Sequence, residues 1–600
     1  MNLLVEIGFN NLAYRQIHKA SDLGVSMLKE ELRRHEISYR KLEVFFSKYR
    51  LTFWLRLGQG EQGEARLRDA VAAFLNRLAN MTEVCKAANS LIALVGGTVL
   101  SLQVGGLVSG TTIKIGGKPF EVKDTQHYWR ELGKNMVVLD NGQREKLIRR
   151  LLVKAATEAG GEVVSSPVMN EVVVSAEQPV LQILTFNQEL TAVPEKLIMI
   201  VMEKHLCFGI KENEKLLNKA AYISNHDGES PDLNGALVKA ASLYYSDLDV
   251  ALEERQRRLK SLPYLKGLGN YYDKQQRLEK IVLAIADQVD AGENVCNMGR
   301  QASALAKIDL TAKICALYPE FSGQMGGIIA QRHGASDMVA SAIIEHWCPG
   351  KYSRRLPHTL VGALLGVADR LDDICGHYHQ GEFKLSQHRM VKTWFDEMIA
   401  IIDSVALDVA MSRLLKFSLS LYESQHLVPW REKDLDYLLK VFTGRLFCYL
   451  RTQDYPEDIA NALTLIQSDN VYASLEKARI MAKSGFAEET ESCAEACKAL
   501  DRICAQEYKY EEAAREFLEQ PEEKDLFEVY LVSRDEIRAG LADRRFSDVL
   551  VRLAKLKAPL MRFLNAVDLD TDNQPLKFNR LSLLAEIRQL YHQYADFSLL

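Results

Sequence analysis

The sequence has little net charge and no paired cysteines. Its formal charge is −5 over 600 residues, which excludes a histone-like protein that binds nucleic acid through an overall positive field. The 10 cysteines are scattered, and no two of them form a Cys-x-x-Cys pair. We therefore expect reduced thiols in the cytoplasm, and any nucleic-acid contact has to come from a local basic patch.

The commonest catalytic signatures are also missing. The chain contains no P-loop, Gly-x-Ser-x-Gly elbow, dinucleotide-binding fingerprint or zincin helix. Its first twenty residues lack the basic start, apolar core and cleavage site of a signal peptide, so we expect no export. No catalytic residue can be named from motifs of these kinds.

One long uncharged run, residues 87–113, requires a membrane test. It exceeds the ~20 residues that a helix needs to cross a bilayer. Gly96-Gly97 and Gly105-Gly106 interrupt it, however, and Gly-Gly between short apolar runs is typical of hairpin turns. We predict a buried β-meander over residues 90–122 and no membrane partner.

The remaining pattern predicts a multidomain α+β protein. The first part of the chain contains both the apolar alternation of strands and the apolar spacing of helices. The turn-rich stretch 224–235 is the clearest domain boundary in the chain. Beyond it strand signals nearly vanish, which predicts an all-α region divided near residues 405 and 520. The expected strands are 3–7, 52–57, 171–185 and 199–210, and the expected early helices are 19–35, 64–88 and 143–159. The expected domains are an N-terminal α/β body (1–89), a β-rich module (90–230) and two helical domains (231–404 and 405–600).

A metal phosphohydrolase of the His-Asp type is one functional hypothesis. Such an enzyme needs a lone His, an adjacent His-Asp pair and a later Asp around its ion. The helical middle offers His333, His346 and Asp369 but no His-Asp pair among them. The single His-Asp dipeptide, His226-Asp227, lies in the boundary loop, so we expect no metal site here.

Other possible ligands have simpler interpretations. Cys493, Cys497 and Cys504 share one helical face, but no histidine is near them in sequence, which favours small core residues. His377 and His379 are expected to form a surface turn rather than a ligand pair.

The stretch 544–562 carries six basic residues and one acid. Its leucines and valines form a stripe at helical spacing, which leaves the basic residues on the other side of the helix. Such a face is usually a solubility device, but it could also bind phosphates. The candidate cations are Arg545, Arg552, Lys555 and Arg562, with Lys577 and Arg580 nearby; Arg580 could instead pair with Asp596. A second cluster, with the same two interpretations, contains Arg255, Arg257, Arg258 and Lys260.

Several stretches resemble, in order, the beta subunit of the tetrameric bacterial glycyl-tRNA synthetase. The opening LLVEIG, LTAVPEKLIMIVMEKH (190–205) and LPYLKGLGNYYDKQQR (262–277) are short pieces of this resemblance. The longer pieces are AKIDLTAKICALYPEFSGQMGGIIAQRHG (306–334), residues 340–376 and PLKFNRLSLLAEIRQLYHQYADFSLL (575–600). We identify the chain as similar to this family along nearly its whole length.

The resemblance implies a degenerate His-Asp-type helical domain in the middle and an anticodon-binding type of helical domain at the end. It also implies binding of tRNA(Gly), with glycine, ATP and Mg²⁺ handled by a separate alpha subunit. This chain would then be non-catalytic, would hold no cofactor and would work within an oligomer. The resemblance also implies that the basic face over 544–562 binds phosphates of the tRNA.

Polar signature residues of the family are replaced in this chain. Its Gly-Thr-Glu-Glu-Leu-Pro becomes Gly8-Phe9-Asn10-Asn11-Leu12-Ala13, and its Arg-Gly-His-Arg-Phe becomes 109–113, SGTTI. Two hypotheses therefore stay open beside the hydrolase: a working synthetase subunit, and a diverged paralogue that acts as an RNA-binding or regulatory scaffold.

Overall fold

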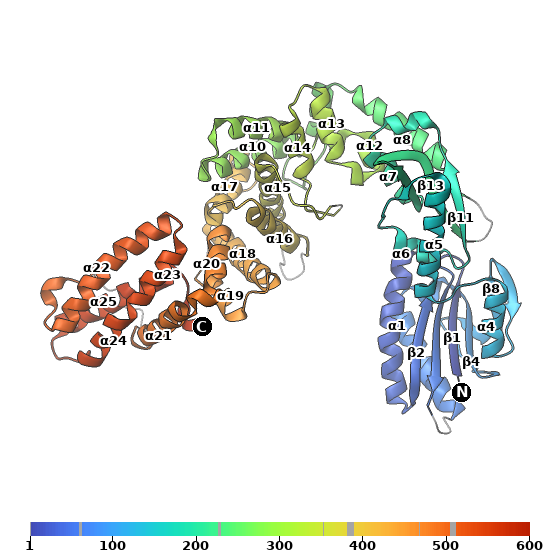
Figure 1. The fold of residues 1–600 in the computed structure, drawn as a ribbon, viewed down its shortest axis with the longest axis horizontal. Helices are drawn as coiled ribbons and strands as arrows, with labels where there is room; N and C mark the ends of the chain where they lie inside the picture. The colour runs from blue at the N-terminus through green and yellow to red at the C-terminus, as the bar shows by residue number, and fades with distance from the viewer. Residues whose placement is uncertain are drawn as a thin grey trace. The chain divides into compact units, whose positions relative to one another are not determined.

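The computed structural model describes residues 2–58, 63–225, 230–351, 353–380, 389–466, 469–504 and 512–600. The chain forms two compact units, Met1–Ser246 and Asp247–Leu600. The first unit contains the sheets and the second is helical (Figure 1), which confirms the α+β class. The expected boundaries at 89, 230, 404 and 520 stay predictions.

A seven-stranded sheet forms the first half of the N-terminal unit. Its order is β2-β3-β1-β4-β7-β6, with β5 paired to β4, and only β4 and β7 run parallel. Leu3, Val5 and Ile7 pack on one face with the helices α1 and α2, whereas Leu4 packs on the other face with Tyr128 of α4. Successive side chains of a strand point to opposite faces. Because both faces of the sheet are covered here, β1 is buried on both sides. The bounds are β1 Asn2–Phe9, β2 Tyr39–Phe46, β3 Arg50–Leu57, β4 Ala88–Val95, β5 Thr98–Val99, β6 Gln103–Val104, β7 Leu107–Gly110, α1 Tyr14–Arg34, α2 Glu64–Met81, α3 Val84–Ala87 and α4 Thr125–Lys134.

The uncharged run forms short hairpins as predicted, but not one continuous meander, because β4 and β7 pair in parallel and residues 112–121 form a separate two-stranded sheet. Gly96 starts the β4–β5 turn, Gly105-Gly106 joins β6 to β7, and Gly116-Gly117 joins β8 (Thr112–Ile115) to β9 (Lys118–Glu121). All five of these glycines have positive φ, between 55° and 86°, which side chains with a Cβ rarely adopt. Among the described residues, no helix combines the length and the apolar character that crossing a membrane requires.

A four-stranded antiparallel sheet, β10-β12-β13-β11, forms the second half of this unit. The expected helix at 143–159 is α5, which Asp140 caps by accepting from the Gln143 backbone N–H at 2.7 Å. Two expected strands are wrong in part, because 171–175 belong to helix α6 and 199–204 to helix α7. The bounds are β10 Glu162–Val163, β11 Pro179–Thr185, β12 Cys207–Glu212, β13 Lys215–Asn225, α5 Asn141–Ala159, α6 Met169–Ser175, α7 Glu195–Lys204 and α8 Leu233–Leu248.

A buried ion network connects the two sheets of this unit. Arg50 on β3 donates to Glu177, just before β11, with its Nε 2.7 Å from Oε1. Its Nη1 also lies 3.3 Å from Glu6 on β1, and the Tyr128 hydroxyl donates to Glu6 at 2.5 Å. All of these side chains are almost fully buried. Arg50 therefore compensates two carboxylates that would otherwise be costly to bury.

The second unit is helical, as predicted, and within its described residues the only β pairings are two isolated bridges. Its central helix is α15 (Leu360–His379), most of whose residues are buried against α10, α14, α16 and α17. The other bounds are α9 Leu252–Ser261, α10 Tyr271–Gln288, α11 Gly292–Leu305, α12 Lys313–Leu317, α13 Gln324–Arg332, α14 Asp337–Glu345, α16 Arg389–Ser404, α17 Met411–Ser424, α18 Glu432–Thr452, α19 Glu457–Thr464, α20 Val471–Met481, α21 Ala487–Ile503, α22 Pro521–Ala542, α23 Phe546–Lys555, α24 Lys557–Ala566 and α25 Gln574–His592, with short 3₁₀ turns that include η2 (Ile308–Thr311) and η6 (Phe597–Leu599).

Candidate functional site

The buried helix α15 presents three carboxylates on one face. Asp369, Asp372 and Asp373 stand at i, i+3 and i+4, so they point to the same side of the helix. The Nζ of Lys274 on α10 lies 3.0, 3.2 and 2.7 Å from their oxygens. Lys307 directly precedes η2, and its backbone adopts the left-handed conformation. Its Nζ donates to Asp369 Oδ2 at 2.6 Å. We call these five residues the lysine-filled acidic centre.

Charge balance in this centre is complete. Arg277 donates from its Nε to Asp372 at 2.6 Å, so three cations face three carboxylates. Burial alone would raise the pKa of Asp369, but the Lys274 and Lys307 ammonium groups hold that pKa well below its usual range. Burial likewise opposes charge on Lys274, and the aspartates more than offset this and raise its pKa. A divalent ion would add two positive charges to a site that is already neutral.

The histidines of the metal hypothesis do not join this centre as a ligand set. His346 is fully buried at the end of α14, where its Nδ1 lies 2.6 Å from the Ile343 carbonyl oxygen. Burial, and then the nearby Lys307, lower the pKa of His346 from 6.5 to about 3. His333 is exposed at the end of α13. Within the described ranges, neither gathers with Asp369 and a third ligand side chain, so these residues do not fit a hydrolytic metal ion. His226-Asp227 lies outside the described residues.

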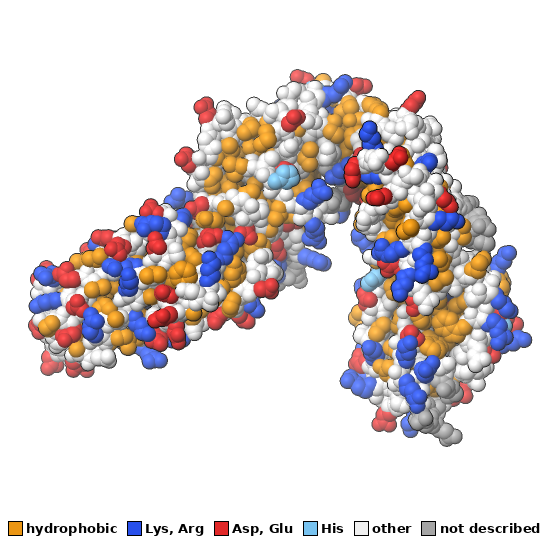
Figure 2. All heavy atoms as spheres, viewed as in Figure 1, with side chains coloured by type: hydrophobic (Ala, Val, Ile, Leu, Met, Phe, Trp, Pro, Cys, Tyr) orange, Lys and Arg blue, Asp and Glu red, His pale blue; other side chains and the backbone are white. Residues whose placement is uncertain are grey.

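The predicted basic face over α23 and α24 carries acids as well as cations. Arg545 lies 3.0 Å from Asp543, Arg552 lies 2.8 Å from Glu536, and Arg562 lies 2.6 Å from Asp525. Lys555 is exposed and forms no ion pair with another described residue. Figure 2 shows acidic and basic side chains interspersed over the helices at the C-terminal end. The face is therefore of mixed charge, because α22 supplies carboxylates beside the predicted cations.

The two cations on α25 differ in their surroundings. Lys577 is 2.8 Å from Asp570 and partly exposed. Arg580 is only 3% exposed, forms an ion pair with Glu523 and donates to the Asp568 carbonyl at 2.7 Å. The expected alternative partner, Asp596, instead accepts from Ser598. A buried, paired guanidinium holds α25 against α22, and we leave Arg580 out of the face that a phosphate could reach.

Two other sequence interpretations change. In the second basic cluster Arg255 is fully buried and donates to Thr311 at 3.0 Å, so it does not belong to a solvated face. His377 and His379 do not form a turn; they lie in the last turn of α15, with ring centroids 4.9 Å from Trp394 and 5.3 Å from Tyr422. Cys493, Cys497 and Cys504 are buried, as expected for core residues.

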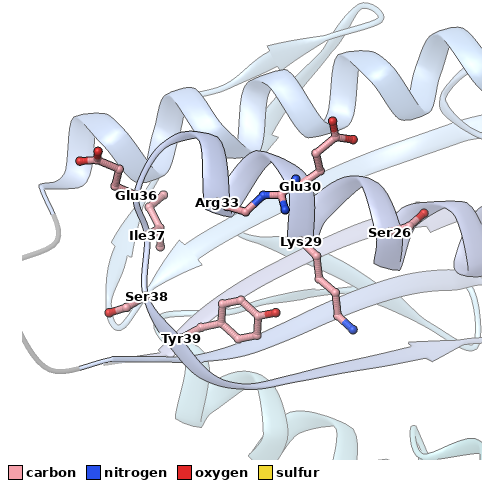
Figure 3. A pocket seen from close by; sticks show the side chains of 8 residues that line it. All are labelled: Ser26, Lys29, Glu30, Arg33, Glu36, Ile37, Ser38 and Tyr39. Carbon is pink, nitrogen blue, oxygen red and sulfur yellow. The ribbon is translucent and has the colours of Figure 1, made fainter.

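The N-terminal unit has an open hollow of about 760 Å³ beside α1 and β2. Figure 3 shows its lining side chains, among them Lys29, Arg33 and Tyr39, together with Glu30 and Glu36. Two cations and two carboxylates leave this lining without net charge, and it holds no histidine or cysteine.

The lysine-filled acidic centre lies within the stretch that matches a known family, whereas the C-terminal face over α23 and α24 lies beyond that stretch. The family model for the glycyl-tRNA synthetase beta subunit matches residues 79–464. The glycine–tRNA ligase beta subunit of Geotalea daltonii is 27% identical over 525 residues, 84% of this chain and 76% of that protein. Those of Halothermothrix orenii and Thermotoga sp. strain RQ2 are each 25% identical, over 89% and 85% of this chain and 81% and 76% of theirs. Because the family model matches more than half of the chain, this protein belongs to the glycyl-tRNA synthetase beta subunit family.

Proposed function

We propose that this chain is a tRNA-binding subunit that supports ATP-dependent glycylation of tRNA(Gly), catalysed by a separate alpha subunit that holds ATP and Mg²⁺. The observation that carries the proposal is the extent of the family match, since relatives named as glycine–tRNA ligase beta subunits align with 80% or more of the chain. The chain itself contributes no catalytic group, and its partners are tRNA and the alpha subunit in a hetero-oligomer.

Two regions of the helical unit are suited to an RNA backbone. On α23 and α24, Lys555 is free of ion pairs with described residues, and Arg552 and Arg562 hold only surface carboxylates. Such surface pairs are worth roughly 0–1 kcal/mol, so a phosphate can replace the carboxylate at little cost. In the loop before α15, Arg354 and Arg355 are exposed and form no ion pair with another described residue. We propose that both regions contact tRNA.

The first experiment neutralises the C-terminal face. A triple variant, Arg552→Gln, Lys555→Gln and Arg562→Gln, is titrated with bulk tRNA at several salt concentrations after its helicity is checked. Each phosphate contact removed should weaken binding and reduce the salt slope by about one unit. Unchanged affinity and slope would exclude this face as the binding surface.

A control of opposite sign uses the acids on α22. Asp525→Asn and Glu536→Gln release Arg562 and Arg552 from their carboxylates. If the face binds phosphates, this double variant should bind tRNA more tightly than the parent and with a steeper salt dependence. A change that only perturbs folding would weaken binding in both variants.

The partner-dependent step has its own test. We expect the isolated chain to show no glycine-dependent pyrophosphate exchange and no tRNA charging, and we expect charging when the alpha subunit of the same source is added. Exchange by the chain alone would contradict the assignment of chemistry to the partner.

The alternative of a scaffold paralogue is supported by the replacement of two polar signatures of the family, at Gly8–Ala13 and at residues 109–113. Of the first stretch Phe9 and Leu12 are buried, whereas Asn10 and Asn11 are exposed. Tight tRNA binding without charging in the presence of the alpha subunit would support the paralogue. Sequencing the RNA that copurifies with the native chain would then identify its ligand.

A further inference from the structure

Four metal-ligand side chains meet where the C-terminal segment returns to α21. Cys497 and Asp501 stand one turn apart on α21, His592 is the last residue of α25, and Asp596 precedes η6. One donor atom from each of the four lies within 4.8 Å of all the others. The Cys497 Sγ and the Asp501 Oδ1 are each 4.0 Å from His592 Nε2.

We propose that Cys497, Asp501, His592 and Asp596 form a zinc site. A thiolate and an imidazole select Zn²⁺ over Mg²⁺ or Ca²⁺, and two carboxylate oxygens complete a tetrahedral set of four. Metal–donor bonds of about 2.0–2.3 Å place tetrahedral donors roughly 3.3–3.8 Å apart. The donors, now up to 4.8 Å apart, need to close by about 1.5 Å at most, which side-chain rotation can supply.

The charges at this site favour a divalent cation. With the Cys497 proton released to solvent, the thiolate and two carboxylates carry three negative charges, and Arg588, paired with Asp501, returns one positive charge. The remaining deficit of two is the charge of Zn²⁺. The lysine-filled acidic centre is the opposite case, because its two lysines and the neighbouring Arg277 already balance its three aspartates.

The surroundings hold the ligands in place. Asp596 accepts from the Ser598 backbone N–H at 3.2 Å and from its hydroxyl at 2.6 Å, both on Oδ1. Arg588 orients Asp501 in the same manner. Hydrogen bonds of this kind fix ligating carboxylates around a metal.

Zinc at this position would tie α21 to the end of α25 and to the C-terminal turn. The bound ion would therefore stabilise the docking of the last residues of the chain against the helical unit. It would have a structural role, because all four coordination positions are filled by protein.

The experiment uses the full-length chain, stripped of metal and titrated with Zn²⁺ in competition with a chromophoric chelator, and with Co²⁺ as a spectroscopic probe. We expect about one ion per chain, a thiolate-to-cobalt absorption band and the visible bands of a tetrahedral site. Cys497→Ser should abolish the thiolate band, and His592→Gln should reduce Zn²⁺ affinity by tenfold or more. Cys493→Ser, one turn earlier on α21, is the matched control and should keep both.

If Cys497→Ser fails to fold, Asp596→Asn gives the same test without changing a buried side chain. Loss of affinity in Asp596→Asn with retention in Cys493→Ser supports the site. Absence of zinc binding at micromolar concentrations by the folded parent chain would overturn the proposal. So would a thiolate-to-cobalt band that survives Cys497→Ser.

Discussion

The buried His346 predicts a loss of stability in mild acid. Its pKa is lowered from 6.5 to about 3 by burial and by Lys307. In the unfolded chain the imidazole regains an ordinary pKa near 6.5. Between pH 6.5 and pH 3 the unfolded state therefore binds one more proton than the folded state, so the free energy of unfolding falls as the pH falls.

The size of this effect follows from the two pKa values. From pH 7.5 to pH 5 a group with folded and unfolded pKa values of about 3 and 6.5 removes about 2 kcal/mol from the free energy of unfolding. Other groups also titrate in this range, so the quantity to measure is the difference between the parent and His346→Leu. The variant lacks the titrating group and should lose about 2 kcal/mol less than the parent over the same interval.

The assay follows urea unfolding at the two pH values by pulsed hydrogen exchange, with the labelling pulse at one fixed pH. Mass spectra of peptides from α14 and α15 then report the transition of the helices that enclose His346. His333→Gln, which removes an exposed imidazole at the end of α13, is the matched control and should keep the parent's pH difference. The reasoning is refuted if His346→Leu loses as much stability as the parent.

Three further predictions concern buried contacts, each measured by urea unfolding. Arg50→Met should cost about 3–5 kcal/mol, because it leaves two buried glutamates without their cation; a cost under about 1 kcal/mol would mean that water reaches them. Lys307→Met should cost a similar amount, and addition of Mg²⁺ or Zn²⁺ should not restore the loss if the acidic centre is not a metal site. Gly327→Ala should cost about 1–3 kcal/mol, since its Cβ would lie 2.7 Å from the Ile344 side chain. Gly444→Ala, whose Cβ meets nothing within 4 Å, should instead stabilise α18 by up to about 1 kcal/mol, and equal effects in both variants would contradict the steric argument.

Local sequence signals predicted most elements, and the errors have physical causes. The hairpin turns could be predicted from their glycines, because a backbone with positive φ strongly favours glycine. The valines at 172–174 predicted a strand by β-propensity, yet they form α6, whose Val172 and Val173 pack into one core and Val174 into another. Tertiary packing overrode propensity there. For α7 the sequence does contain helix signals: Pro194 and Glu195 stand at its start, and Lys204 stands at its end. The strand prediction gave more weight to the apolar run between them.

The candidate sites were less predictable, because they depend on contacts between distant residues. Lys274 and Lys307 lie 95 and 62 residues from Asp369, and no pattern indicates that a lysine will be buried. Cys497 likewise meets a histidine 95 residues away, which the sequence around the cysteine could not reveal. Burial of Arg580 depends on Glu523, 57 residues earlier. Helical amphipathicity predicts which face is polar, but it does not predict which acid will lie opposite each cation.

The two lysines of the acidic centre also bear on how this domain depends on its surroundings. A metal-dependent fold gains stability only in proportion to the logarithm of the free ion concentration, and it loses that stability to a chelator. An ammonium group on the same chain cannot be diluted or removed. Its local concentration is fixed by the backbone that carries it, at 3.0 and 2.6 Å from Asp369. The helical unit therefore has built-in counterions at α15, and their contribution to stability does not vary with the concentration of a free ion.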